Sequence, residues 1–83
     1  MSKRIEIYEI ECDYYDACER NGNTRMHSDR AAQWAKEVVA GTNLQLKQLA
    51  YEEDEFKFRF LFTDGITNRF FYGKQLLEHV GQA

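Results

Sequence analysis

The side chains best suited to chemistry are two cysteines and two histidines, Cys12, Cys18, His27 and His79. Structural zinc sites usually take their ligands in pairs separated by roughly two to four residues. Five residues separate the two cysteines, and no histidine pair has a comparable spacing. The sequence therefore predicts no metal site and no cofactor. It predicts reduced cysteines that act as small apolar side chains filling gaps in the core.

Covalent catalysis would need a serine or cysteine beside a histidine. Ser2 lies at the chain end and Ser28 has the position of a helix cap, which leaves Cys18 facing His27 across a turn as the remaining arrangement. The sequence contains no phosphate-binding glycine loop, no G-x-S-x-G, no H-E-x-x-H and no C-x-x-C. We therefore expect a protein that is not an enzyme.

Carboxylates are concentrated in two stretches. Residues 1–19 hold six acids against two bases, and residues 52–55 are four consecutive acids. On an extended strand Glu9, Glu11 and Asp13 would point the same way, about 6.6 Å apart. That is about two steps of the 3.4 Å phosphate spacing of a nucleic-acid strand, so the row could imitate phosphates. A solvated face that protects a sheet edge is the simpler interpretation.

These acids occur beside tyrosines, and together they predict a surface that binds a basic protein. Tyrosine provides a large contact area in interfaces, and acids at the rim speed association with a basic partner. The predicted partner-binding residues are Glu9, Glu11, Asp13, Tyr14, Tyr15, Asp16, Glu52, Glu53, Asp54 and Glu55, with Tyr8 and Tyr51 as further anchors.

Basic and aromatic residues alternate over residues 56–60, as Phe-Lys-Phe-Arg-Phe. Sheet surfaces hold single-stranded nucleic acid with rings and nearby cations. On a strand, however, the phenylalanines and the basic residues point to opposite faces, so the cations lack stacking rings. The alternative function is therefore weak nucleic-acid binding by a patch on the outer sheet face, made of Lys57, Arg59, Arg69 and Phe71.

The elements that must position these residues begin with an extended segment over residues 4–19. Ile5 and Ile7 share one parity, whereas the apolar residues from Tyr8 to Tyr14 share the other. A strand with strict alternation does not change parity. The pattern therefore predicts a bulge near residue 7 or a strand covered on both faces.

The Asn-Gly pair at residues 21–22 is a strong hairpin signal, because a type I′ turn needs positive φ at both central residues. We expect residues 24–27 to pair back onto the first strand. The alternative is a short helix over residues 13–20, capped by Asp13 and ended by the glycine.

The main helix is predicted over about residues 29–40. Ser28 offers an N-cap and Gly41 follows the last turn. Apolar residues recur at helical spacing on one side and polar residues on the other. This stripe is expected in the core and consists of Ala31, Trp34, Ala35, Val38 and Val39.

Two strands are predicted next, over residues 44–51 and 56–62. The first changes parity near Lys47, and the acidic run forms the turn between them. In the second, phenylalanines alternate with other residues. This pattern predicts a central strand with buried phenylalanines.

A hairpin joins this central strand to another over residues 66–72. A two-residue turn would place Phe60 opposite Arg69, whereas a three-residue loop places Phe58 opposite Phe70. A slip of one residue moves every side chain to the other face. Burial therefore favours the three-residue loop.

The last element is a short helix over residues 73–80 that ends at Gly81. With 83 residues, 43% of them apolar, the chain predicts one small domain over residues 1–83. The predicted class is α+β, an antiparallel sheet of four to five short strands with the main helix on one face and the short C-terminal helix beside it.

The net charge is −3, which disfavours binding to nucleic-acid phosphates or anionic lipid as the main activity. No apolar run approaches the roughly 18 residues of a membrane span, and the start lacks the apolar region of a signal peptide. We expect a cytoplasmic protein that makes no membrane contact.

In general character the chain is small, acidic and rich in aromatic residues, without a catalytic motif. In this it resembles the accessory proteins of phages and mobile elements, including anti-CRISPR and anti-restriction inhibitors. The resemblance is one of composition and covers no alignable residues. It implies stoichiometric inhibition or adaptation of a basic, nucleic-acid-handling protein or complex. A homodimer is an additional option.

Overall fold

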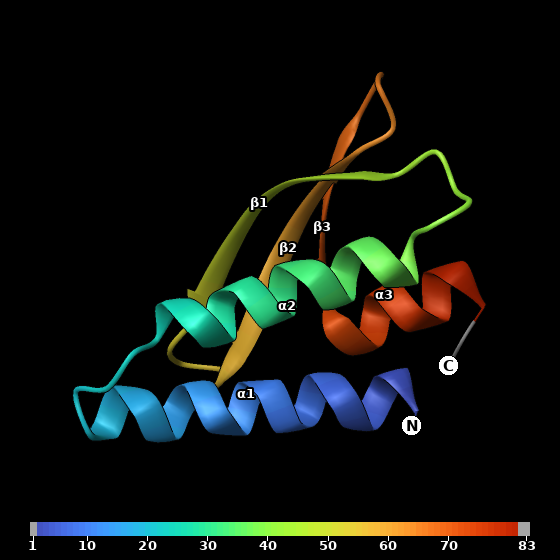
Figure 1. Ribbon diagram of the computed structural model, residues 1–83. Coiled ribbons are helices and arrows are strands. Elements are labelled where there is room, and N and C mark those ends of the chain that lie inside the picture. Colours follow the sequence, from blue (N-terminus) through green and yellow to red (C-terminus); the bar gives the residue numbers. More distant parts are fainter. Residues whose placement is uncertain (1, 82–83) are drawn as a thin grey trace.

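A computed structural model describes residues 2–81. The chain forms α1 (Lys3–Glu19), α2 (Arg25–Val38), β1 (Gln45–Glu52), β2 (Lys57–Thr63), β3 (Asn68–Tyr72) and α3 (Gly73–Val80). The strands make an antiparallel sheet in the order β1-β2-β3, with the helices gathered on one side of it (Figure 1). The α+β class and the central place of β2 are confirmed. The prediction of four to five strands is wrong, and the long first helix was not predicted, since residues 2–81 contain three strands and three helices.

Helix α1 replaces the extended segment predicted over residues 4–19. The Ser2 hydroxyl oxygen caps it by accepting hydrogen bonds from the backbone N–H groups of Arg4 and Ile5, at 3.1 and 3.4 Å. The alternative prediction, a short helix over residues 13–20, has the right structure at the end of this segment but begins ten residues too late.

The strand prediction failed because aromatic and apolar side chains occur on more than one side of α1. The buried stripe contains Ile7, Ile10 and Ala17, at the spacing of a helix. Tyr8 and Tyr15 lie outside this stripe and are exposed. Their presence removes the periodicity by which a helix is identified from sequence.

The Asn-Gly pair ends α1 and does not form a hairpin. Asn21 has a φ of 53°, and the backbone N–H of Gly22 donates to the carbonyl oxygen of Ala17 at 2.7 Å. A left-handed residue followed by such a bond is a common helix ending. The chain then enters α2 at Arg25, about one turn before the predicted cap at Ser28.

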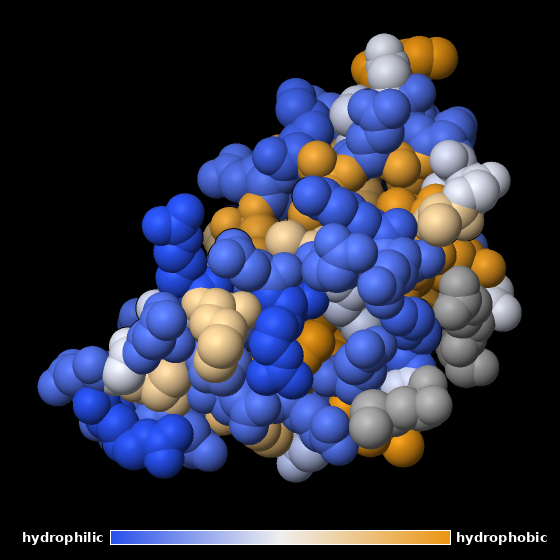
Figure 2. All heavy atoms as spheres, viewed as in Figure 1, coloured by the Kyte–Doolittle hydropathy of each residue, from blue (hydrophilic) through white to orange (hydrophobic). Residues whose placement is uncertain are grey.

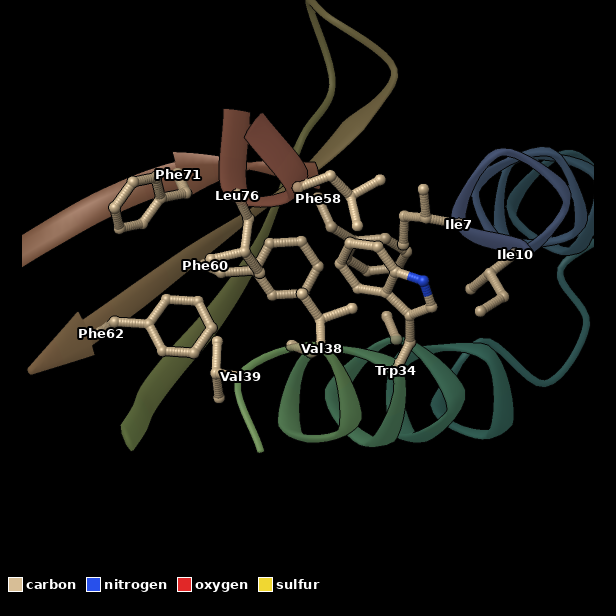
Figure 3. Close-up of a cluster of buried hydrophobic side chains, with 13 residues drawn as sticks. Ile7, Ile10, Trp34, Val38, Val39, Phe58, Phe60, Phe62, Phe71 and Leu76 are labelled. Carbon is tan, nitrogen blue, oxygen red and sulfur yellow. The ribbon is translucent and has the colours of Figure 1, made fainter. Parts of the chain in front are cut away.

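Helix α2 packs its apolar stripe against the sheet, as predicted. Trp34 lies with its ring centroid 5.6 Å from that of Phe60, and its Nε1–H donates to the backbone carbonyl of Lys3 at 2.8 Å (Figure 3). Trp34 thus joins α1, α2 and the sheet. The predicted stripe of Ala31, Trp34, Ala35, Val38 and Val39 is buried throughout.

The middle strand β2 carries the aromatic part of the core. Phe58, Phe60 and Phe62 are fully buried and point toward the helices (Figure 3). The pairing of β1 with β2 shifts by one residue at Lys47, which confirms the irregularity predicted there.

The β2–β3 hairpin has a longer loop than predicted. Residues 64–67 connect the strands, and the Asp64 carboxylate accepts hydrogen bonds from two backbone N–H groups of the loop, each at 2.8 Å. These bonds stabilise the longer loop. The resulting register places Phe60 opposite Phe71, which is buried, and turns Phe70 to the outer face.

Helix α3 follows β3 directly, and its first residue, Gly73, lies close to side chains of α1 and α2. A Cβ on Gly73 would lie 3.1 Å from Cγ1 of Ile7 and 3.4 Å from the ring of Trp34. The helix ends at Gly81, whose φ of 80° is the left-handed conformation expected of a C-terminal glycine. The C-terminal helix predicted over residues 73–80 is confirmed.

The helical side of the molecule presents mainly hydrophilic residues to solvent (Figure 2). Within residues 2–81, no helix combines the length and the apolar character that crossing a membrane requires. Exposed aromatic side chains occur at two places. Tyr8, Tyr15 and Phe56 lie beside α1, and Phe70 lies on the outer face of the sheet.

Candidate functional site

A groove of about 540 Å³ lies between the outer side of α1 and the turn that leads into β2. Three exposed aromatic residues line it: Tyr8, Tyr15 and Phe56. The Tyr8 side chain is 67% exposed and that of Phe56 57% exposed. The other lining residues are Glu11, Cys12, Asp16, Glu55 and Lys57.

Phe56 has an unusual backbone conformation. Its φ of 56° is in the left-handed region, which bulky residues rarely adopt. The ring lies edge-on to that of Tyr15, with centroids 5.3 Å apart and an interplanar angle of 77°. The prediction that Phe56 is buried with the other phenylalanines is therefore wrong, because the strand alternation breaks at this residue.

Glu11 attaches α1 to the sheet at the base of the groove. Its Oε2 accepts a hydrogen bond of 2.8 Å from the backbone N–H of Phe58. Burial raises the pKa of the Glu11 carboxyl above its ordinary value, although this hydrogen bond and the charge of Lys57 act in the opposite direction. Glu11, predicted to bind a partner, is thus engaged within the fold.

Two of the predicted tyrosine anchors also pack internally. The ring of Tyr14 lies 4.4 Å from that of Tyr51 and 4.9 Å from that of Phe58. Burial raises the pKa of both tyrosine hydroxyls above the ordinary value. Tyr14 and Tyr51 are half-buried parts of the core margin, so Tyr8 and Tyr15 are the exposed tyrosines of this region.

The phosphate-like row predicted for Glu9, Glu11 and Asp13 does not form. On a helix, residues two positions apart differ by about 200° in direction, so Glu11 points away from Glu9 and Asp13, which lie one turn apart on the same side.

Two of the predicted acids are engaged in ion pairs. Asp13 lies 3.0 Å from the guanidinium of Arg30, and Glu52 lies 3.1 Å from that of Arg59. Asp16 and Glu55 line the groove. The exposed predicted acids are Glu9, Asp13, Asp16, Glu53, Asp54 and Glu55.

The cysteines are exposed, so the prediction that they fill gaps in the core is wrong. Cys12 lines the groove. The turn that would have opposed Cys18 to His27 is absent, because both residues lie in helices. His27 instead has its Nδ1 3.2 Å from the guanidinium of Arg30. Across residues 2–81, no group of three His, Cys, Asp or Glu side chains is placed to hold a metal ion.

The second candidate surface is the face of the sheet opposite the helices. Cross-strand partners share a face, and Arg59 pairs with Tyr72 while Leu61 pairs with Phe70. The guanidinium of Arg59 lies 4.5 Å from the ring centroid of Phe70, and the ammonium of Lys57 lies 5.6 Å from that of Tyr72. Cations and rings therefore occur together on this face.

Two of the residues predicted for this patch lie elsewhere. Phe71 is buried, with its ring centroid 6.0 Å from that of Phe62. Arg69 pairs with Phe62 and therefore belongs to the helical side of the sheet, with its guanidinium 5.0 Å from the ring centroid of Phe71. Sequence reasoning missed Phe70 and Tyr72, because the loop length that places them was predicted one residue too short.

Comparisons with protein-family models, with curated proteins and with solved structures found no match. We therefore infer function from the geometry of these two surfaces. Sequence analysis named Tyr8, Tyr15, Asp16 and Glu55 but missed the exposure of Phe56. The signal in the sequence that could have pointed to this exposed cluster is the presence of Tyr8 and Tyr15 in the first helix, outside its buried stripe.

Proposed function

We propose that this chain is a protein-interaction module that acts by stoichiometric binding, with the groove beside α1 as its contact surface. The observation that carries the proposal is the convergence of Tyr8, Tyr15 and Phe56 at one exposed place. Clustered exposed aromatic side chains are typical of interaction sites. Phe56 also has the unfavourable positive φ that tends to persist at functional positions.

The chemistry of the groove favours a basic partner. Asp16 and Glu55 line it, and the acidic turn over residues 52–55 adjoins it. Tyrosine and phenylalanine rings attract Lys and Arg cations, more strongly when the cation is shielded from water. Acids at the margin speed the approach of a positively charged surface. An arginine- or lysine-bearing segment of another protein satisfies both features.

Within this proposal, the chain is a cytoplasmic inhibitor or adaptor of a basic protein that handles nucleic acid. The small size, net negative charge and phage-like composition support this more specific form. Stoichiometric binding requires no cofactor, and the residues that carry it are Tyr8, Tyr15, Asp16, Glu55 and Phe56. Glu11 and Tyr14 support them from beneath by holding α1 against the sheet.

The experiment compares two variants that each remove one exposed apolar side chain. Phe56→Gly removes the ring from the groove. Because glycine adopts a positive φ without steric strain, the variant should remain folded. Ile66→Ala removes a side chain that is 92% exposed at the tip of the β2–β3 hairpin. Both are used beside the wild type in affinity purification from the native host, with mass spectrometry to identify retained proteins.

We expect a basic protein that is retained by the wild type and by Ile66→Ala and is lost with Phe56→Gly. Retention of the same proteins by all three chains would refute the groove as the contact surface. Binding of the captured partner is then measured with purified proteins, where the expected stoichiometry is one to one.

A further inference from the structure

The outer face of the sheet is left uncovered by the helices. Phe58, Phe60 and Phe62 point to the helical side (Figure 3), so the residues between them in β2 point the other way. On that outer face, Phe70 is 56% exposed and Tyr72 is half-buried. The two residues lie two positions apart on one strand, so their Cα atoms are about 6.7 Å apart.

Positive charge accompanies these rings. Lys57 and Arg59 reach the same face from β2 and lie over the rings of Tyr72 and Phe70. Glu52 lies on the same face, opposite Lys57 in the strand register, and its carboxylate forms an ion pair of 3.1 Å with the guanidinium of Arg59. Residues 56–74 hold four basic residues against one acid, although the whole chain has a charge of −3. Of the four, Lys57 and Arg59 lie on this face, whereas Arg69 belongs to the helical side. This region is therefore the basic part of an acidic protein.

We propose that this face binds single-stranded nucleic acid, with bases stacked on Phe70 and Tyr72 and phosphates neutralised by Lys57 and Arg59. Stacking on aromatic side chains beside cations is the general mode by which proteins hold single strands without sequence preference. The face presents rings rather than a protruding element that could enter a groove of duplex DNA. Unpaired bases, whose flat faces are accessible, fit it better than a duplex.

The observed register removes the objection that the sequence raised against this activity. The phenylalanines of β2 do point away from its basic residues. The rings that accompany Lys57 and Arg59 come instead from β3, because the four-residue loop turns Phe70 and Tyr72 outward. The predicted patch contained the correct basic residues of β2, Lys57 and Arg59, but the wrong aromatic residue, Phe71 instead of Phe70.

The site is distinct from the groove except at one residue. Lys57 lines the groove and also lies over Tyr72, so a change at Lys57 would affect both surfaces. Phe70 does not line the groove. Substitution of Phe70 therefore tests the sheet face, whereas substitution of Phe56 tests the groove.

The experiment is a fluorescence anisotropy titration of labelled oligo(dT) and oligo(U), each about 12 nucleotides long, beside a DNA duplex of equal length. We expect the single strands to bind more tightly than the duplex, with affinity that falls between about 50 and 200 mM salt. Phe70→Leu should weaken single-strand binding roughly tenfold, since it removes a stacking ring. The matched variant Phe56→Leu, at an equally exposed aromatic residue, should bind like the wild type.

Three results would overturn the proposal. One is the absence of single-strand binding by the wild type at about 50 mM salt. Another is equal binding of duplex and single strands that Phe70→Leu leaves unchanged, which indicates charge attraction alone. The third is a dimer in sedimentation that Phe70→Leu dissociates, which would show that a second copy covers the face. Circular dichroism confirms that each variant is folded, and loss of partner binding in Phe56→Gly tests the groove separately.

Discussion

The groove beside α1 and the outer face of the sheet both combine exposed aromatic rings with charge, but they are built differently. The groove joins residues from α1 and from the turn before β2, which are about forty positions apart in the chain. It depends on a phenylalanine with positive φ. The sheet face arises from the regular alternation of two adjacent strands. Exposed aromatic residues can thus result from a break in a pattern or from the pattern itself.

The two surfaces also differ in their balance of charge. Three carboxylates line the groove against Lys57, whereas Lys57 and Arg59 reach the sheet face against Glu52. A basic protein and a nucleic acid are therefore the respective partners that electrostatics favours. Under the two proposals, the groove would bind a basic protein and the sheet face a single strand of nucleic acid.

The largest expected effect concerns the core on which both surfaces rest. Phe60 is fully buried between α2 and the sheet, so Phe60→Ala should cost about 3–5 kcal/mol of unfolding free energy. The measurement is denaturant unfolding, and both binding activities should fall together. A loss below about 1 kcal/mol would contradict the burial described for β2. Ile66→Ala is the control, with an expected change within about 0.5 kcal/mol.

The next effect distinguishes the two surfaces through Glu11. Glu11→Ala leaves the N–H of Phe58 without its acceptor and should cost about 1–3 kcal/mol. Because this bond attaches α1 to β2, binding in the groove should weaken, while oligonucleotide binding at the sheet face should persist in the folded fraction. Equal loss of both activities would show that the two surfaces are not separable.

Titration of Glu11 should make the free energy of unfolding depend on pH. Burial raises the pKa of Glu11 in the folded chain above its ordinary value of 4.5, so the folded state holds the proton more tightly than the unfolded state. Its contribution to stability is therefore largest at low pH and falls as the pH rises from about 4.5 through the raised pKa.

Glu11→Gln lacks this titration and retains an oxygen that can accept from Phe58. Urea unfolding at several pH values between about 4 and 7 should show the wild type losing stability relative to Glu11→Gln as the pH rises. A gain of the wild type relative to the variant over this interval would mean that the hydrogen bond outweighs burial.

A kinetic effect should separate the groove from the rest of the acidic surface. Asp16→Lys reverses a charge that lines the groove and should slow association with a basic partner by up to about tenfold at low salt. Glu9→Lys makes the same change at an exposed position of α1 outside the groove and should have a smaller effect. Stopped-flow association at two salt concentrations compares them. Equal slowing would indicate that net charge, rather than the groove, guides the encounter.

The smallest effect on stability is expected at the cysteines. Both are exposed, so Cys12→Ser and Cys18→Ser should each change the unfolding free energy by less than about 0.5 kcal/mol. Alkylation of Cys12 in the Cys18→Ser background should nevertheless obstruct the groove and reduce partner binding. Oligonucleotide binding should stay unchanged, and reduction of both activities would contradict the separation of the two surfaces.

Sequence reasoning succeeded where local pattern and burial agree. Helix α2 buries the apolar stripe around Trp34, and strand β2 buries Phe58, Phe60 and Phe62, while the opposite side of each element carries the other residues of its pattern. The glycine that ends α3 was likewise recognisable, because its position needs positive φ. In the candidate site, the sequence predicted the acids and tyrosines that line the groove, but it placed those of the first segment on a strand, whereas they lie on a helix.

The failures have a common cause. Tyr8 and Tyr15 lie outside the buried stripe of α1, and Phe56 interrupts the alternation of the strand that follows it. Each residue departs from the pattern of its own element, and all three meet in the groove. Such departures are expected where a sequence meets a demand other than the stability of its fold.

By itself the sequence determined the class of the fold, the main part of α2, the central strand and the division of charge between an acidic start and a basic later segment. Only the tertiary structure decided that residues 3–19 are helical, that Phe56 is exposed and that Phe70, not Phe71, faces outward. Periodicity reports which side of one element is apolar. It does not report whether an apolar side chain finds a neighbour, because that depends on loop lengths and on contacts between residues far apart in the chain.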